Sequence, residues 1–432
     1  MCGLYRLCRL GEMKAPRGMH DILPDEAERW QALEAIIRDF AARFGYGEIR
    51  TPVVEHTEVF QRTIEEKEMY TLTDRGGRSL TLRPEGTAAV MRAYLEHGMA
   101  SQPQPVRLYY IAPMFRYDRP QKGRYRMHHQ FGAEIIGSPS PTADVEVLSL
   151  PIRLIQALGL TEVSVRLNSV GDPVCRPAYE EALRAYFTKH IDRLCEDCRR
   201  RLQVNPLRIL ECKEPECHAV AMDAPKMVEH LCEPCREHLT AVKSLFTAIG
   251  IPFVDDPMIV RGLDYYTRTA VEVHSGRLGG AQNSMLGGGR YDGLAEQLEG
   301  PPVPGVGFGQ GIERLLLVLK SEGLEIPHPA RHPDGIAVFV ASVGAAADLE
   351  AFRLVDQLRR AGISAVGEMQ GRGLRAQMKQ ADKLGVRYAV ILGEQELAAR
   401  QAGVRDMRNG SQDGVALDRI LQTLSARIKE QP

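Results

Sequence analysis

The chain has 432 residues but contains no long apolar run, no excess of charge of either sign and no Gly-Lys-Ser/Thr phosphate-binding loop. Because no stretch of about 18 apolar residues occurs, we expect no membrane-spanning helix and no membrane partner. The formal net charge of −1 does not indicate a basic nucleic-acid-binding protein, although a local basic patch is enough for such binding. Residues 1–12 interleave arginine with leucine and lack the continuous apolar stretch of a secretory signal. These absences favour a cytoplasmic globular protein.

Arrangements typical of covalent catalysis and of dinucleotide folds are missing as well. No Ser/His/Asp or Cys/His set stands out, and the run 305–311 has a glycine at every second position, unlike the Gly-x-Gly-x-x-Gly of a dinucleotide fold. Alternate glycines clear one face of a strand, so that a flat ligand or a neighbouring helix can lie close to it. We therefore expect any catalysis to depend on substrate positioning and charge stabilisation.

The order of predicted elements indicates an α+β domain that is interrupted by a helical insertion and followed by a separate, mostly parallel α/β domain. At about 150 residues per domain, the length also predicts two or three domains. The predicted parts are an N-terminal extension at 1–12 before an alternative start at Met13, the first part of the α+β domain at 13–172, a cysteine-rich insertion at 173–256, the second part at 257–325, a linker at 326–333 and the C-terminal domain at 334–432.

Strands are predicted over 49–54, 106–115 and 127–136, and the last two form a long antiparallel hairpin around a polar loop. One face of the last strand is polar and the other is mostly apolar. The polar face comprises Arg126, His128, Gln130, Gly132 and Glu134. Such a face is either the floor of a small polar ligand site or a solvent-exposed strand face.

Three arginines, Arg116, Arg261 and Arg314, occur at strand or loop ends of the α+β domain. Arginine suits bidentate contacts to phosphate and carboxylate groups. Acceptors in the same domain are Glu85, Gln130 and Glu134. The set fits a phosphate chain next to a cationic amine, whereas any one of these arginines alone is more often a surface salt-bridge former.

Several segments resemble blocks of the histidyl-tRNA synthetases, a family of class II aminoacyl-tRNA synthetases, and the resemblance extends from Pro16 to the C-terminal helix. The segment Arg-Gly-Leu-Asp-Tyr-Tyr at 261–266 is close to diagnostic, whereas the class II motifs alone are not. The other resembling segments are 16–21, 82–87, 115–137, 288–293 and 305–314, with 49–52 similar to motif 1, the hairpin to motif 2 and 305–314 to motif 3. The resemblance implies an α+β catalytic domain with an antiparallel sheet of the class II type, a helical insertion and a C-terminal α/β anticodon-binding domain.

The resemblance also implies the activity of a histidine–tRNA ligase. Such an enzyme activates L-histidine with ATP to histidyl-adenylate and pyrophosphate, and it then transfers the histidyl group to the 3′-terminal ribose of tRNA(His). ATP is thus an expected substrate, and Mg²⁺ is expected to neutralise the pyrophosphate. A homodimer is implied because motif 1 lies at the subunit interface in class II enzymes.

The family's functional residues carry over to matching positions of this sequence. The implied catalytic residues are Arg261, at the histidine carboxylate and the α-phosphate, and Arg116, at the α-phosphate. The implied ATP-binding residues are Arg116, Asp118, Arg124, Tyr125, His128 and Arg314. The implied histidine-binding residues are Glu85, Thr87, Gln130, Glu134, Arg261, Tyr265, Tyr266 and Tyr291. Among the latter, Glu134, Tyr266 and Tyr291 are expected to recognise the imidazole, which needs both an acceptor and a donor.

The sequence departs from the family pattern near the expected site. The segment between Arg62 and Glu68 is several residues shorter than usual, which predicts a trimmed loop. His128 stands where phenylalanine is usual under the adenine, Asp118 replaces a glutamate and Val271 replaces a phenylalanine.

Two alternative functions follow from these departures and from the family's relatives. One is a histidine- or tRNA-sensing module without catalysis, which only the trimmed loop and His128 favour. The other is a non-catalytic paralogue that regulates an ATP phosphoribosyltransferase. Such paralogues typically lack the C-terminal domain and an intact 261–266 block, and this chain has both.

Six cysteines of the insertion form three closely spaced pairs, Cys195 with Cys198, Cys212 with Cys217 and Cys232 with Cys235. Cytoplasmic thiols disfavour disulfides, and Cys-x-x-Cys pairs favour a metal. We therefore predict a structural zinc site of Cys195, Cys198, Cys232 and Cys235, with Cys212 and Cys217 as alternative ligands and reduced free cysteines as the competing interpretation.

Overall fold

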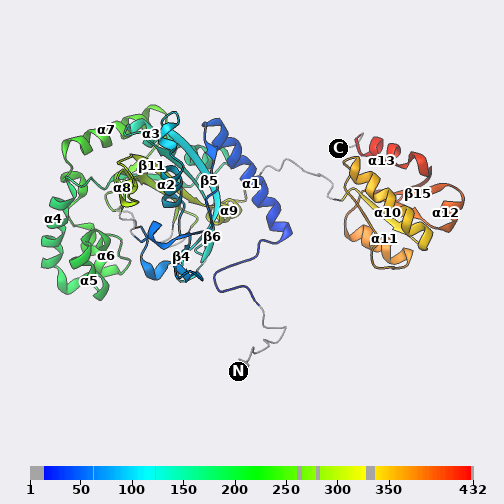
Figure 1. The fold of residues 1–432 in the computed structure, drawn as a ribbon, viewed down its shortest axis with the longest axis horizontal. Coiled ribbons are helices and arrows are strands. Elements are labelled where there is room, and N and C mark those ends of the chain that lie inside the picture. The colour runs from blue at the N-terminus through cyan, green and yellow to red at the C-terminus, as the bar shows by residue number, and fades with distance from the viewer. Residues whose placement is uncertain are drawn as a thin grey trace, which may run out of the picture. The chain divides into compact units, whose positions relative to one another are not determined.

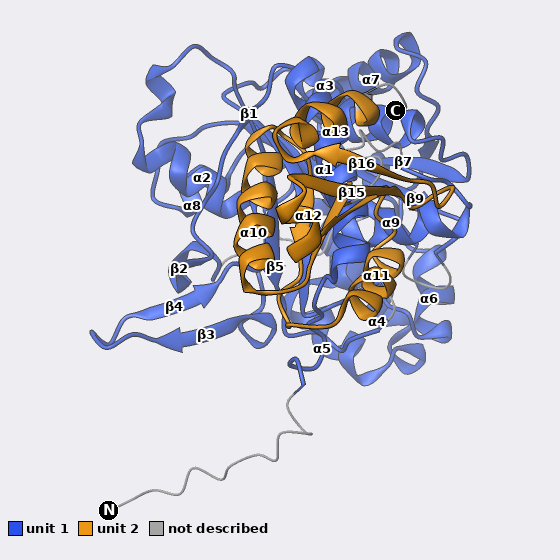
Figure 2. Ribbon diagram, turned by 90° about the vertical axis from the view of Figure 1, so that its right-hand side faces the viewer, with its two compact units in different colours: residues 1–327 blue, residues 328–432 orange. Residues whose placement is uncertain are grey.

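The computed structural model describes residues 14–61, 63–121, 123–259, 265–278, 283–326 and 336–429. Its two compact units are Met1–Pro327 and His328–Pro432, coloured blue and orange in Figure 2. The extension at 1–12, most of the predicted linker and Arg261 lie outside the described residues. None of the described helices is long and apolar enough to cross a membrane.

An eight-stranded, mainly antiparallel sheet forms the centre of the first unit (Figure 1). Among its described strands, the edge pairs β1–β5 and β7–β8 are parallel and the other pairs are antiparallel. The strand order is β1 (Gly47–Glu48), β5 (Val106–Phe115), β6 (Met127–Ile136), β11 (Gly305–Gly311), β10 (Ser284–Arg290), β9 (Thr267–Ser275), β7 (Val163–Ser169) and β8 (Val254–Asp255). The predicted α+β fold with an antiparallel sheet is therefore confirmed.

The predicted hairpin is present, since β5 pairs with β6 along its whole length. The alternation of β6 is also as predicted, because Phe131, Ala133 and Ile135 are buried in a hydrophobic core on one face. The helices that contribute to this core are α1 (Pro24–Arg43), α3 (Pro141–Ala157) and α9 (Ile312–Ser321). On the other face of β6, Glu134 accepts a hydrogen bond from Thr87, the first residue of α2 (Thr87–Glu96). The short α8 (Leu294–Gln297) contacts α2.

The strand predicted over 49–54 is not formed, which corrects that prediction. The chain leaves the central sheet after β1 and enters a three-stranded sheet of order β2 (Val54–His56), β4 (Ser79–Leu82) and β3 (Tyr70–Thr73). Pro52 has no N–H to donate to a ladder. In addition, Arg83 donates to the carbonyl oxygens of Thr51 at 2.7 Å and Pro52 at 3.4 Å, so these acceptors bind a side chain instead of a neighbouring strand.

The insertion between β7 and β8 is helical and shares the core of the central sheet. Its helices are α4 (Arg176–Lys189), α5 (Glu196–Val204), α6 (Pro215–Met222) and α7 (Glu233–Ala248). Figure 1 shows α4, α5 and α6 gathered at one side of the first unit, with α7 leading back along α3. One continuous core contains Tyr179 of α4, Phe246 of α7 and Phe131 of β6. The insertion therefore packs as part of the first unit.

The second unit is a five-stranded sheet with four helices among its described residues. The strand order is β13 (Ala365–Gly367), β12 (Val338–Ser342), β14 (Tyr388–Leu392), β15 (Gln401–Asp406) and β16 (Gln412–Ala416), and the helices are α10 (Ala345–Arg360), α11 (Leu374–Lys383), α12 (Glu394–Ala398) and α13 (Ile420–Lys429). The first three strands are parallel, as the βαβαβ rhythm predicts. The antiparallel pair β15–β16 was not predicted, because its fully buried positions are confined to Ala402 and Val404.

Candidate active site

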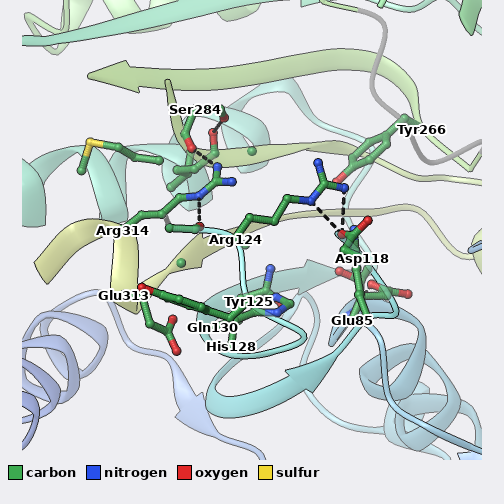
Figure 3. Close-up of a pocket in the computed structure, with 18 of the residues that line it drawn as sticks. Glu85, Asp118, Arg124, Tyr125, His128, Gln130, Tyr266, Ser284, Glu313 and Arg314 are labelled. Atoms are coloured by element: carbon green, nitrogen blue, oxygen red, sulfur yellow. Dashed lines mark hydrogen bonds and ion pairs between the residues drawn. The ribbon is translucent and has the colours of Figure 1, made fainter. Parts of the chain in front are cut away.

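A polar cavity of about 320 Å³ lies on the polar face of β6 (Figure 3). The predicted site residues that line it are Glu85, Thr87, Arg116, Asp118, Arg124, Tyr125, His128, Gln130, Tyr265, Tyr266 and Arg314. Glu134 and Tyr291 lie next to this lining, fully buried, and the hydroxyl of Tyr291 donates to Glu134 at 2.6 Å. Segments that are far apart in the sequence therefore meet at one site, while the predicted catalytic Arg261 lies outside the described residues.

Arginines form one end of the cavity, and backbone carbonyl groups and one carboxylate hold them in place. The Nε of Arg314 donates to the carbonyl oxygen of Gly123 at 2.9 Å, and its Nη1 donates to that of Ser284. Arg124 forms an ion pair with Asp118 at 2.7 Å (Figure 3). Burial, together with the positive charge of Arg124, lowers the pKa of Arg314. Two guanidinium groups this close create a positive potential that attracts an anion.

Arg116 and His128 continue this end of the cavity toward the centre of the sheet. The Nε of Arg116 donates to the carbonyl oxygen of Pro84 at 2.9 Å, which fixes the guanidinium beside the start of α2. Burial and the charges of Arg116 and Arg314 lower the pKa of His128 to about 3. The ring of His128 is therefore neutral near pH 7 and offers an uncharged aromatic face among cationic neighbours.

A buried carboxyl group with three hydroxyl donors lies next to the cavity lining, and we call this part of the site the acidic end. Glu134 accepts hydrogen bonds from Tyr291 at 2.6 Å, Thr87 at 2.8 Å and Tyr110 at 3.4 Å. Burial raises the pKa of Glu134 to about 8, the hydroxyl groups of Tyr291 and Thr87 lower it, and the charge of Glu85 raises it further. A carboxyl group held in this way can either accept or donate a hydrogen bond near neutral pH.

Glu85 is the second acidic group of this end, and the start of α2 holds it. Its carboxylate accepts hydrogen bonds from the backbone N–H of Thr87 at 3.0 Å and of Ala88 at 3.1 Å, and from the hydroxyl of Tyr265 at 3.4 Å. Burial raises the pKa of Glu85, while the N–H of Ala88 and the charge of Arg116 lower it. The Glu85 carboxylate thus lies at the junction between the two ends, where it can accept from a cationic amine.

The glycines of β11 make room for side chains of the neighbouring strand. A Cβ atom at Gly307 would overlap the carboxylate of Glu134, and a Cβ atom at Gly309 would overlap the amide of Gln130. The face that alternate glycines clear in 305–311 is therefore filled by the site's own residues on β6. At these two positions, side chains of β6 lie in the cleared space instead of a neighbouring helix.

Tyr110 is a site residue that the sequence analysis missed. Its ring fills the space over Gly86 and Gly132, where a Cβ atom would overlap it, and its hydroxyl donates to Glu134. Tyr110 is also the direct partner of Gly132 in the β5–β6 register. An aromatic residue paired with a glycine across a hairpin is the signal that would have found it.

Arg290 is a second residue without a predicted role, and it holds the end of β10 directly before Tyr291. Its guanidinium is fully buried, bonded to the buried carboxylate of Asp144 and paired with Asp292 at 2.9 Å. The carboxylate of Asp144 also accepts a hydrogen bond from Nε2 of His238 in α7 at 3.1 Å. This network joins α3, β10 and α7, so it fixes the strand end from which Tyr291 reaches Glu134.

The segment before Glu68, which is predicted to be shorter than in the family, contacts both the hairpin loop and the insertion. The backbone N–H of Tyr117 donates to the carbonyl oxygen of Glu68 at 2.8 Å. Glu65 forms an ion pair with Arg208 of the insertion. Arg62 lies outside the described residues. The trimmed segment is therefore anchored at two points beside the cavity.

The cysteines form two separate groups, which corrects the predicted combination of the two Cys-x-x-Cys pairs in one site. In the first group, the sulfur atoms of Cys195, Cys198, Cys212 and Cys217 all lie within 4.8 Å of one another. In the second group, the ligand atoms of Asp172, Cys175, Cys232 and Cys235 meet the same limit. The two Cys-x-x-Cys pairs have the same spacing, so the sequence does not show which other residues each pair contacts in the folded protein.

Comparisons with known proteins agree with this arrangement. The sequence profile described as histidyl-tRNA synthetase matches residues 18–315, and the profile described as anticodon binding domain matches residues 337–427. A curated histidine–tRNA ligase of Pelotomaculum thermopropionicum is 50% identical over 419 residues, which cover 96% of this chain and 97% of the relative. Another, from Caldanaerobacter subterraneus subsp. tengcongensis, is 47% identical over 413 residues, covering 94% and 98%.

Solved structures show the same relation. The apo histidyl-tRNA synthetase of S. aureus is 40% identical with a TM-score of 0.79, and the match covers 95% of this chain and 99% of that one. A chain described as an ATP phosphoribosyltransferase regulatory subunit/histidyl-tRNA synthetase from Bacillus halodurans C is 23% identical with a TM-score of 0.63, covering 88% and 98%, which shows a shared fold alone. From the profile over 18–315 and the identity along nearly the whole chain, this protein belongs to the histidyl-tRNA synthetase family.

Proposed function

We propose that the cavity activates L-histidine with ATP and that the chain then charges tRNA(His), the two-step reaction of a histidine–tRNA ligase. In the first step, a carboxylate oxygen of histidine attacks the α-phosphorus of ATP, which forms histidyl-adenylate and expels pyrophosphate. In the second step, a hydroxyl of the 3′-terminal ribose attacks the histidyl carbonyl carbon and AMP leaves. Both nucleophiles belong to substrates, so the protein acts by positioning them and by stabilising charge.

The arginine end holds the nucleotide in this proposal. The proposed ATP contacts are Arg116, Asp118, Arg124, Tyr125, His128 and Arg314. Arg116 contacts the α-phosphate, where negative charge grows during attack, and Arg124 reaches toward the γ-phosphate. ATP enters as its Mg²⁺ complex, in which the cation neutralises the leaving pyrophosphate. The neutral ring of His128 stacks with the adenine.

The acidic end holds histidine. The proposed contacts are Glu85, Thr87, Gln130, Glu134, Arg261, Tyr265, Tyr266 and Tyr291. Glu85 accepts from the α-ammonium group, while Glu134 and its tyrosine neighbours recognise the two imidazole nitrogens, one as a donor and one as an acceptor. Arg261, only four residues before Tyr265 in the sequence, is assigned to the histidine carboxylate and the α-phosphate.

One observation carries the proposal: an end formed by arginines and an end formed by buried acidic and tyrosine side chains belong to one site, with Glu85 between them. A binding site for ATP alone has no use for the second end, and a site for histidine alone has no use for the first.

Histidine-dependent ATP–pyrophosphate exchange, measured with each of the twenty amino acids, tests this function. We expect exchange with histidine only. An Arg261→Ala variant is expected to lose adenylate formation while the fold and most ATP affinity remain. The absence of exchange with every amino acid, in folded protein, would instead point to the regulatory paralogue or to the sensing module.

The wider setting follows from the same proposal. The second unit, matched by the anticodon-binding profile, is proposed to bind tRNA(His), and the protein is proposed to act as a homodimer in the cytoplasm. The first point is tested by comparing aminoacylation of tRNA(His) transcripts by the full chain and by a chain that lacks the residues after 334. Sedimentation of the full chain tests the second point.

We also propose that the group of Cys195, Cys198, Cys212 and Cys217 in the insertion, here called the four-cysteine group, holds a structural zinc ion. In a tetrahedral site with Zn–S bonds of about 2.3 Å, neighbouring sulfur atoms are about 3.8 Å apart. The sulfur atoms of Cys195 and Cys212 are 3.9 Å apart. The backbone N–H of Cys195 also donates to the sulfur of Cys217 at 3.0 Å, an outer contact typical of metal–thiolate sites.

A further inference from the structure

A second group of possible metal ligands lies where the insertion leaves the central sheet and where its last helix, α7, begins. We call it the Asp172 cluster, and it consists of Asp172, Cys175, Cys232 and Cys235. Asp172 and Cys175 belong to the turn between β7 and α4, and Cys232 and Cys235 begin α7. The cluster therefore joins the start of the insertion to the start of its last helix.

The distances within the Asp172 cluster fit a tetrahedral cation site. The sulfur atoms of Cys175 and Cys235 are 3.9 Å apart. The carboxylate of Asp172 lies 3.3 Å from the sulfur of Cys175 and 3.7 Å from that of Cys232. For Zn–S bonds of about 2.3 Å and Zn–O bonds of about 2.1 Å, the expected edges are about 3.8 Å and about 3.6 Å.

The local backbone favours negative charge at these ligands. Cys175 and Cys232 occupy the cap positions directly before α4 and α7, and Cys235 lies in the first turn of α7. Helix starts stabilise thiolates and carboxylates through their N–H groups. The carboxylate of Asp172 already accepts from the N–H of Val174 at 3.0 Å and of Cys175 at 3.2 Å. These hydrogen bonds hold the Asp172 carboxylate in a fixed orientation, as the groups around a metal site do for its ligands.

We propose that the Asp172 cluster binds a second zinc ion, separate from the ion proposed for the four-cysteine group. Binding deprotonates the three thiols, which release their protons to solvent, and the carboxylate supplies the fourth ligand. Three thiolates and a carboxylate around Zn²⁺ leave a net negative charge. Arg268, whose guanidinium lies 3.8 Å from Asp172, is placed to offset part of it.

This site would support the histidine end of the cavity. The turn that carries Asp172 exchanges backbone hydrogen bonds with β9: Arg268 N–H donates to Gly171 at 2.7 Å, and Val170 N–H donates to Arg268 at 2.7 Å. Arg176, next to Cys175, donates to the carbonyl oxygen of Tyr266. A cation at the cluster therefore fixes the turn that holds the tyrosine pair, a positioning role outside the chemistry itself.

Zinc content of the full-length protein, purified under reducing conditions without chelators, tests the proposal. By mass spectrometry of the metal, we expect two zinc ions per wild-type chain. We expect one zinc ion per chain in Cys232→Ser and one in Cys198→Ser. The second variant is the matched control, because Cys198 and Cys232 both belong to Cys-x-x-Cys pairs that begin a helix. A combined variant is expected to hold none.

Cobalt substitution keeps the test informative if a variant is poorly stable. The Cys198→Ser protein loaded with Co²⁺ should retain a thiolate-to-cobalt charge-transfer band, which Asp172→Asn should shift and Cys232→Ser should remove. The proposal is overturned if wild-type protein binds a single zinc ion that Cys198→Ser removes and Cys232→Ser leaves in place. It is also overturned if thiol titration of the purified protein shows that Cys175 and Cys235 are joined by a disulfide.

Discussion

The two ends of the cavity handle charge in opposite ways. At the arginine end, carbonyl groups or a carboxylate hold the side chains of Arg116, Arg124 and Arg314 at the cavity. At the acidic end, Glu134 is fully buried among hydroxyl groups, and its pKa rises to about 8. In the proposed function, the first end selects a polyanion by electrostatic attraction, whereas the second selects histidine by pairing the hydrogen-bonding groups of the ligand and of the site.

Removal of an arginine at the first end should have the largest effect. We expect Arg116→Ala to lower the rate of histidine-dependent exchange about 10²- to 10³-fold, because the guanidinium is directed at growing charge. Arg119→Ala is the matched control, since Arg119 belongs to the same loop but is exposed and does not line the cavity. Equal loss in both variants would mean that loop charge in general, and not the position of Arg116, matters.

At the second end, Glu134→Gln should impair histidine recognition and spare ATP binding. The glutamine amide has one oxygen acceptor where the carboxyl group has two oxygens, so it cannot make all the hydrogen bonds to the three hydroxyl groups and the imidazole. We therefore expect kcat/KM for histidine to fall about 10²-fold. Separate titrations of histidine and ATP in the exchange assay measure the two effects. A rise in the KM for ATP as large as that for histidine would erase the distinction between the ends.

The same substitution should change how stability depends on pH. The pKa of Glu134 is about 8 in the folded protein and near its ordinary value in the unfolded chain. Wild-type stability therefore falls as the pH rises from about 4.5 through 8, because the unfolded carboxyl ionises first. Glu134→Gln removes this loss, so unfolding at pH 6 and pH 9 should show the variant gaining about 1–3 kcal/mol relative to wild type at the higher pH. Parallel curves for both proteins would contradict it.

The Asp172 cluster offers a third way to separate the ends. Because its turn holds Tyr266, we expect Cys232→Ser to raise the KM for histidine severalfold with a smaller change in the KM for ATP. Readdition of zinc should restore neither value, since the ligand is lost. A matching rise in both constants would show a general loss of structure instead.

The smallest effect is expected for His128→Phe. Both residues offer a neutral ring, so the KM for ATP should change about threefold or less. The pKa of His128 is about 3 in the folded protein, lower than in the unfolded chain, so its contribution to stability is lost as the pH falls from about 6.5 toward 3. The variant should therefore unfold less readily than wild type near pH 4. A large change in the KM for ATP between pH 6 and pH 8 in wild type alone would contradict a neutral His128.

Much of the site was predictable because it depends on local pattern. The alternation of β6 follows from its sequence, and it places His128, Gln130 and Glu134 on one face. Glu85 was expected as an acceptor from its residue type, and segment resemblance then supplied Tyr291; the fold brings both beside that face.

The remainder depends on contacts between distant segments. Tyr110 fills the space left by Gly86 and Gly132, and finding it requires the exact register of the hairpin, which pairs Tyr110 with Gly132. Asp172 and Cys175 belong to no repeated motif, so the partners of the Cys232 pair could not be predicted. The failed strand at 49–54 has a similar cause, because Arg83 reaches it from across the small sheet.

The most direct test of the two-ended site is ATP–pyrophosphate exchange by wild type and Glu134→Gln, measured side by side with all twenty amino acids at saturating ATP. We expect wild type to exchange with histidine only, and the variant to lose most of that exchange while it still binds ATP. No exchange by folded wild type, or equal histidine-dependent exchange by both proteins, would contradict the assignment of Glu134 and of the buried end to histidine.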